Sequence, residues 1–129
     1  MPAPAATKYS WSTVPLEKVN PALSRQIVTG TDVMVAHVHL KAGCIVPKHH
    51  HVNEQVTYIL QGALRLWVGD KVDSQSDADG VLVSAGEVLV IPGNVPHRAV
   101  AVEDTLDLDV FAPPREDWLS GTDDYLRQK

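Results

Sequence analysis

The residues with the clearest capacity for chemistry lie in the stretch HHHVNEQ, which begins at His49. Successive side chains of an extended strand point to opposite faces. One face would therefore carry His49, His51, Asn53 and Gln55, and the other His50, Val52 and Glu54. Two imidazoles and an amide oxygen make part of a coordination sphere for a divalent first-row metal. We therefore predict that Gln55, and not the neighbouring Glu54, joins His49 and His51 as a metal ligand.

A fourth ligand is expected from another strand. His97 follows the turn sequence IPGNVP, which can direct its side chain inward. Three nitrogens and one oxygen suit Zn, Ni, Fe, Mn or Cu, so this donor set predicts a divalent transition metal without naming it. Such a site keeps one or two positions open and can polarise a substrate oxygen. The alternative is structural, because a histidine on a strand is commonly a hydrogen-bonded residue, and a run of three also suits a solvated loop.

Acidic, aromatic and basic side chains near the C-terminus form a second candidate group. In the stretch TLDLDVF, alternation places Asp107, Asp109 and Phe111 on one face of a strand. A buried carboxylate needs a partner, so this face suits the wall of a pocket, although both acids could instead face water on an outer sheet. Arg115 follows two prolines and could clamp an anion bidentately, or pair at the surface with its acidic neighbours.

The elements that must position these side chains are short strands. From residue 30 onward, apolar and polar residues alternate in runs separated by glycine or proline, which is typical of an antiparallel all-β sandwich or barrel. We predict one β-barrel domain over residues 29–114. The proline-rich residues 1–28 are expected to form an irregular arm with one edge strand. Residues 115–129 form a tail, in which TDDYLRQK predicts a short helix beginning at Thr122.

Length and charge limit the partners of the protein. The chain has 129 residues, of which 44% are hydrophobic and 21% charged, as in an ordinary single-domain globular protein. Its formal net charge of -5 argues against nucleic acid or an anionic membrane as a partner, because both require a basic patch. The single cysteine, Cys44, has no partner for a disulfide, and no stretch is apolar enough for a membrane span. We therefore predict a cytoplasmic protein with a small-molecule substrate.

Two motifs resemble those of the cupin superfamily. Residues 43–62 follow the first motif, which is glycine, five residues, HxH, three or four residues, an acid position that Gln55 occupies here, six residues and glycine. Residues 86–97 resemble the second motif, glycine, five residues, PxG, two residues and histidine. Asn94 stands where a second glycine is usual, and Ala101 stands at the terminal asparagine position. The resemblance implies a single-domain double-stranded β-helix, or jelly-roll barrel, with a metal bound inside it.

A narrower resemblance lies downstream, in residues 108–119. The sequence LDVFAPPREDWL is similar to the tail of small cupins of the pectin-degradation type, which convert cyclic 4,5-unsaturated uronates into linear keto sugars. The resemblance implies that Asp109, Phe111 and Arg115 are pocket residues of a metal-dependent isomerase. A metal-dependent dioxygenase of the same fold and a non-catalytic sugar-binding or small-acid-binding protein are the alternatives, because one fold hosts many reactions.

A homodimer is predicted from another alternating strand. Arg65 and Trp67 alternate with three apolar residues, which indicates a second buried face where a partner subunit could pack. His37 and His39 also alternate with apolar residues and are expected to face solvent or an interface.

Overall fold

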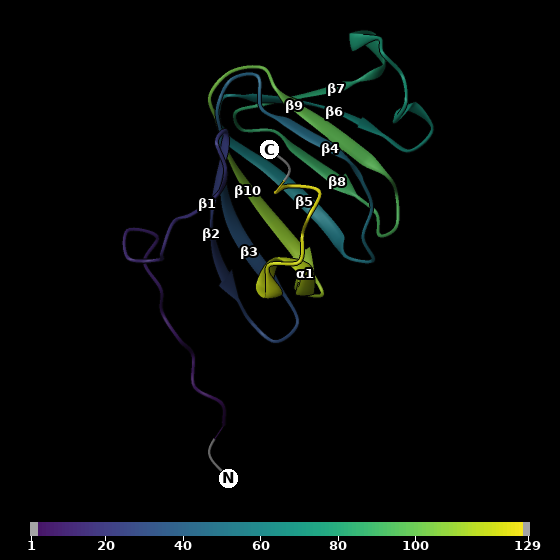
Figure 1. The fold of residues 1–129 in the computed structure, drawn as a ribbon. Coiled ribbons are helices and arrows are strands. Elements are labelled where there is room, and N and C mark those ends of the chain that lie inside the picture. Colours follow the sequence, from purple (N-terminus) through teal and green to yellow (C-terminus); the bar gives the residue numbers. More distant parts are fainter. Residues whose placement is uncertain (1–2, 128–129) are drawn as a thin grey trace.

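The computed structural model of the protein describes residues 3–127 and contains two antiparallel β-sheets (Figure 1). The strands are β1 (Glu17–Asn20), β2 (Leu23–Thr29), β3 (Met34–Leu40), β4 (Ile45–His49), β5 (Glu54–Gln61), β6 (Ala63–Val68), β7 (Val81–Ser84), β8 (Val88–Ile91), β9 (His97–Ala101) and β10 (Thr105–Ala112). One sheet has the order β1-β2-β3-β10-β5-β8, and the other has the order β4-β9-β6-β7. This all-β barrel confirms the predicted fold class.

The core lies between the two sheets and is built from the inward positions of the alternating strands. Val38 and Ile59 of the six-stranded sheet are buried in one cluster with Leu64, Leu66 and Ala99 of the four-stranded sheet. Burial of each large apolar side chain contributes about 1.5–3 kcal/mol to folding. None of the described helices is long and apolar enough to cross a membrane.

Strand β10 lies between β3 and β5 in the middle of the six-stranded sheet. Its side chains alternate between buried and part-exposed positions from Thr105 to Phe111. The buried positions include Asp107 and Asp109, so two carboxyl groups point toward the interior, as the alternation predicts. The opposite face of β10 is apolar and part-exposed.

The N-terminal region is more regular than the arm predicted for residues 1–28. Residues 3–16 lack strands, but β1 and β2 form a hairpin that extends the sheet beside β3. The alternation in β2 was hidden in the sequence because one inward position is a charged residue, Arg25. This side chain is fully buried in an ion pair with Asp123, so the strand buries an arginine where an apolar residue would be expected.

The C-terminal helix lies earlier in the chain than predicted. Helix α1 (Glu116–Ser120) ends at Gly121, which adopts a left-handed conformation with φ of 73° and stops the helix. The prediction of a helix beginning at Thr122 is wrong within the described residues, because residues 122–127 form turns and bends. The last two positions of the predicted helix, 128 and 129, lie outside the described residues.

Polar contacts dock the tail against the N-terminal hairpin. The Arg25 guanidinium donates to Asp123 at 2.6 Å, and Arg127 pairs with Glu17 at 2.8 Å. The Asn20 amide donates to the backbone oxygen of Leu126 at 2.7 Å. The tail is therefore an integral part of the barrel, and its aromatic side chains reach the interior.

Candidate metal centre and its pocket

Three imidazoles meet inside the barrel. His49 on β4 lies directly opposite His97 on β9, and His51 follows two residues after His49. Each of the three offers a ring nitrogen, and these nitrogens all lie within 4.8 Å of one another. The structure therefore brings together the three histidines that the sequence selects.

The turn before β9 explains this convergence. Asn94 has a φ of 64°, a left-handed conformation that asparagine tolerates better than most residues. Its backbone N–H donates to the carbonyl oxygen of His51 at 2.7 Å. A Cβ atom on Gly93 would lie only 2.4 Å from the carbonyl oxygen of Val52, so glycine is required there. These contacts join the two histidine-bearing segments.

Backbone carbonyl groups fix the orientation of each imidazole. The Nδ1 atoms of His49, His51 and His97 lie 2.8, 3.0 and 2.9 Å from the carbonyl oxygens of Pro47, Asn53 and Val95. These acceptors hold the proton on Nδ1 and leave the Nε2 lone pairs available. The Nε2 atom of His97 is buried and has no hydrogen-bond partner among the described residues. A buried ring nitrogen of this kind fits a metal ligand.

Burial keeps the three imidazoles neutral. Desolvation, followed by the field of His97, lowers the pKa of His49 to about 3. Desolvation, followed by the field of Arg115, lowers the pKa of His51 to about 4. Desolvation also lowers the pKa of His97. Neutral imidazole is the form that binds metal, so the site is poised for a ligand at neutral pH.

Gln55 faces the histidines, as the alternation predicts. Its Oε1 atom lies 3.2 Å from Nε2 of His51, while its Nε2 atom donates to Oγ1 of Thr57 at 2.9 Å. The Thr57 hydroxyl in turn donates to Oδ1 of Asp109 at 2.8 Å. This chain fixes the amide with its oxygen toward the imidazoles, the orientation that a fourth ligand needs.

The remaining residues of the HHHVNEQ stretch point elsewhere. His50 and Glu54 are exposed, as expected for the opposite face. Asn53 is buried, but its amide donates to the carbonyl oxygens of Pro113 and Pro114 and not toward the histidines. The difference arises because residues 50–53 leave β4 and cross to the other sheet before β5 begins.

A cavity of about 50 Å³ adjoins the imidazoles. Asp109 and Phe111 line it from β10, with Arg115, Trp118 and Tyr125 from the tail. All three predicted catalytic residues therefore border the same cavity as His49 and His97. The strands also supply apolar side chains to it, namely Leu23, Val38, Leu40, Val46, Leu64, Leu66 and Ala99.

Arg115 is buried and ion-paired at the same time. Its guanidinium donates to both carboxylate oxygens of Asp117, at 2.9 and 2.8 Å, and to the hydroxyl of Tyr125 at 2.8 Å. The guanidinium carbon lies 5.1 Å from the ring centroid of Phe111 and 4.9 Å from that of Trp118. Only 1% of Arg115 is exposed, so its ion pair with Asp117 is not an ordinary surface ion pair.

The family of the chain follows from residues 36–112, which match the Cupin domain family. The chain belongs to the cupin family. The metal-binding motifs that place this cupin's histidines lie inside the matched region. The chain matches no curated protein.

Solved structures extend the comparison. The cupin is similar to KdgF from Halomonas sp., with 27% sequence identity and a TM-score of 0.77, over 88% of this chain and 99% of that one. It is similar to an RmlC-like cupin from Shewanella frigidimarina (24%, TM-score 0.76), over 88% of this chain and 96% of that one. Oxalate decarboxylase from Bacillus subtilis (21%, TM-score 0.73) shares the fold over 93% of this chain and 35% of its own. The predicted resemblance to small single-domain cupins of the KdgF kind is thereby confirmed.

Two residues of the cupin's pocket were missed in the sequence. Tyr125 stacks on His49 with ring centroids 4.2 Å apart, and Trp118 packs on Phe111 at 5.0 Å. Trp118 lies within the tail sequence that resembles pectin-degradation cupins, which was a usable signal. Tyr125 had no such signal, because its position depends on how the tail folds back.

The second buried face predicted on β6 exists, but the cupin's own chain covers it. Trp67 is only 4% exposed, and its indole N–H donates to the carbonyl oxygen of Ser76 at 2.9 Å. The Arg98 guanidinium lies 3.9 Å from the Trp67 ring, and its Nε donates to the carbonyl oxygen of Val72. The segment 69–80 therefore fills this face, and it offers no basis for a dimer.

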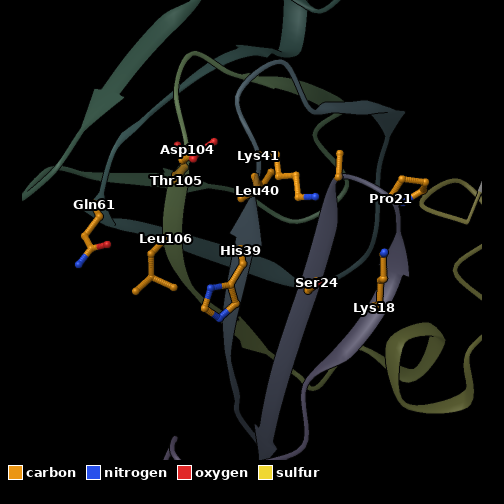
Figure 2. A pocket seen from close by; sticks show the side chains of 11 residues that line it. Lys18, Pro21, Ser24, His39, Leu40, Lys41, Gln61, Asp104, Thr105 and Leu106 are labelled. Atoms are coloured by element: carbon orange, nitrogen blue, oxygen red, sulfur yellow. The ribbon is translucent and has the colours of Figure 1, made fainter.

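A larger hollow lies at the opposite end of β10 from the histidine cluster (Figure 2). Its volume is about 480 Å³. Figure 2 shows that Lys18, His39 and Gln61 are spread around it and do not converge on one point. The cupin's ligand-type side chains gather only at the imidazoles among the described residues.

Proposed function

We propose that this cupin is a metal-dependent isomerase that opens and ketonises 4,5-unsaturated uronates. The observation that carries the proposal is the shared cavity, where Asp109 and Arg115 adjoin His49 and His97 of the neutral imidazole cluster. The likeness to KdgF over nearly the whole chain and the tail motif of pectin-degradation cupins both favour this substrate class.

His49, His51, His97 and Gln55 would hold a divalent metal. Two observations support the fit, the buried Nε2 of His97 without a partner and the fixed orientation of the Gln55 amide. Mn(II) centres occur in the oxalate decarboxylase of Bacillus subtilis, which has the same fold. A bound divalent ion supplies Lewis acidity, which polarises a substrate oxygen and stabilises developing negative charge.

The chain's own residues perform the proton transfers and the orientation. Asp109, as a carboxylate, takes the proton of the anomeric hydroxyl while the ring C–O bond breaks, so that an aldehyde and an enolate form. Asp109 then delivers the same proton to the neighbouring carbon as the enolate becomes a ketone, so the reaction is a balanced isomerisation. Arg115 orients the substrate carboxylate. To do so it gives up one of its two hydrogen bonds to Asp117. Phe111 forms the apolar platform beneath the sugar.

Turnover of unsaturated uronates tests the proposal. We expect the purified, metal-loaded protein to abolish the ultraviolet absorbance of the conjugated double bond. Asp109→Asn should lower kcat by about 100-fold or more, because general acid–base groups contribute about that factor. Glu54→Gln is the matched control, since Glu54 is exposed on the opposite face. Full activity of Asp109→Asn would remove Asp109 from the mechanism, and an inactive wild type would overturn the proposed function.

A dioxygenase is the second candidate, and the apolar part of the cavity favours it. Leu64, Leu66 and Ala99 face the same space as the histidines and would suit a hydrophobic substrate. Oxygen consumption distinguishes the two, because isomerisation uses none. An oxygen electrode that records uptake with an organic substrate would favour the dioxygenase.

A further inference from the structure

A hydroxyl group without an assigned role borders the same cavity. Tyr125 lies in a turn of the tail, and its side chain lines the cavity together with Arg115 and Trp118. Its hydroxyl oxygen accepts two hydrogen bonds, from Nη2 of Arg115 at 2.8 Å and from Nε1 of Trp118 at 3.3 Å. A phenol also has one O–H to donate, and the Tyr125 hydroxyl donates to no group among the described residues.

The two N–H donors restrict the direction of this O–H. Guanidinium and indole nitrogens donate hydrogen bonds and do not accept them, so neither Arg115 nor Trp118 can take the proton of the Tyr125 hydroxyl. The two donors lie against the lone pairs of the oxygen, and the O–H turns away from both. The proton is therefore available to a molecule bound in the cavity.

Contacts on either side of Tyr125 hold its ring in place. The ring stacks on His49, with centroids 4.2 Å apart and an interplanar angle of 20°. Two residues earlier, Asp123 pairs with the buried Arg25 guanidinium at 2.6 Å. The carbonyl oxygen of the residue after Tyr125 accepts from the Asn20 amide at 2.7 Å. A donor fixed in this way needs little reorganisation when negative charge develops beside it.

The position beside Arg115 matches one oxygen of the proposed substrate. In a 4,5-unsaturated uronate, the ring oxygen is bonded to the carbon that carries the carboxylate, and it becomes the enolate oxygen when the ring opens. A carboxylate held by Arg115 therefore brings this oxygen next to the same guanidinium. The Tyr125 hydroxyl lies 2.8 Å from that guanidinium, within reach of the oxygen on which negative charge develops.

We propose that the Tyr125 hydroxyl donates a hydrogen bond to the ring oxygen of the substrate and stabilises the enolate that forms there. The inference rests on the proposed function. Tyr125 transfers no proton, because Asp109 carries the proton from the anomeric hydroxyl to the neighbouring carbon. Tyr125 is a catalytic residue that acts through hydrogen bonding alone.

The variant Tyr125→Phe tests the donor, because it keeps the ring on His49 and removes only the hydroxyl. We expect kcat for an unsaturated uronate to fall about 100-fold, the usual result of losing one donor to a developing oxyanion. KM should stay within about 3-fold, since the hydrogen bond strengthens only as charge develops. Tyr9→Phe is the matched control, because Tyr9 is exposed in the N-terminal region. Metal content should be the same in all three proteins.

Binding of galacturonate separates this role from mere support of Arg115. If the hydroxyl served only to orient the guanidinium, its loss would weaken the binding of any uronate carboxylate. Galacturonate carries the carboxylate and the ring oxygen but forms no enolate. Its Kd for the metal-loaded protein, measured by calorimetry, should therefore change by less than about 3-fold in Tyr125→Phe.

The outcomes distinguish the inference from the proposed function. An active wild type together with a Tyr125→Phe variant of wild-type kcat would overturn the inference alone. A loss confined to KM and to the Kd of galacturonate would also overturn it, because Tyr125 would then only position Arg115. An inactive wild type would overturn the proposed function and the inference with it.

Discussion

The imidazole cluster shows how neighbouring backbone groups prepare side chains for a ligand. Each ring uses Nδ1 for a carbonyl oxygen of a residue two positions before or after it, so a short local contact sets the direction of Nε2. The histidines are thus oriented before any metal arrives. Partners of this type typically change metal affinity by about 10- to 100-fold when they are lost.

Metal content tests which side chains of residues 49–55 face the metal site and which face away from it. We expect His51→Ala to lose the metal that wild type retains after purification, because one of three imidazoles disappears. Glu54→Ala should retain it, since that carboxylate is exposed and faces away. Elemental analysis of the three proteins measures the difference. Retention in the His51 variant would refute the assigned ligand set.

The stability of the metal-free protein should depend on pH through His49. Its pKa is about 3 in the folded protein, against a usual 6.5, so the unfolded chain binds a proton that the folded chain refuses. Stability is therefore complete above about pH 6.5 and falls as pH decreases toward 4, by at most about 1.4 kcal/mol per pH unit for this group. Thermal unfolding of chelator-treated protein between pH 7 and 4 measures this slope. His49→Gln should reduce this slope without abolishing it, because burial also lowers the pKa of His51 and of His97.

At the scale of elements, strand alternation was predictable, and the tail was not. The inward placement of Asp107, Asp109 and Phe111 depends only on the period of an extended strand, which neighbouring residues set. The tail depends on contacts between residues far apart in sequence, such as Arg25 with Asp123. Such contacts leave no pattern in the local sequence. The conformation of residues 122–127 and the position of Tyr125 could therefore not be predicted.

The ion pair between Arg25 and Asp123 should be important for stability. Both side chains are fully buried, so Asp123→Ala would leave the Arg25 guanidinium without its buried partner and with only Glu17, whose side chain is 42% exposed. We expect the free energy of unfolding to fall by about 3–5 kcal/mol, measured by urea denaturation. Lys48→Ala is the control, because its partner Asp73 is exposed and such pairs contribute at most about 1 kcal/mol. Equal effects of the two substitutions would contradict this assignment.

At the scale of the whole molecule, the outer face of the six-stranded sheet is apolar over β10, β5 and β8, whereas on β3 it carries His37, on which Trp11 stacks. In the middle of it, Leu108 lies between His37 on β3 and Tyr58 on β5, and Tyr58 pairs in turn with Val88 on β8. The centre of this face has no formal charge, so it suits a second copy of the same surface better than a charged partner. The neighbouring apolar positions are Val35, Val56, Val90, Leu106 and Val110.

We expect the predicted homodimer to form through this outer face. Leu108→Lys should convert a dimer into a monomer, because it places a charge at the centre of the interface. Arg65→Glu, on the face covered by segment 69–80, should leave the dimer intact. Light scattering after size-exclusion chromatography measures both masses. A wild type that is only a 14.0 kDa monomer would exclude the dimer.

The docked tail also makes the two ends of the chain unequal for protein engineering. Tyr125 and Leu126 line the cavity, whereas residues 3–10 are exposed and precede the barrel. We expect an affinity tag or fluorescent reporter joined after residue 129 to disturb the nearby ion pairs of Arg127 with Glu17 and Asp123. The same fusion at the N-terminus should leave them intact, so the placement of a fusion should decide whether the wall of the pocket keeps its shape.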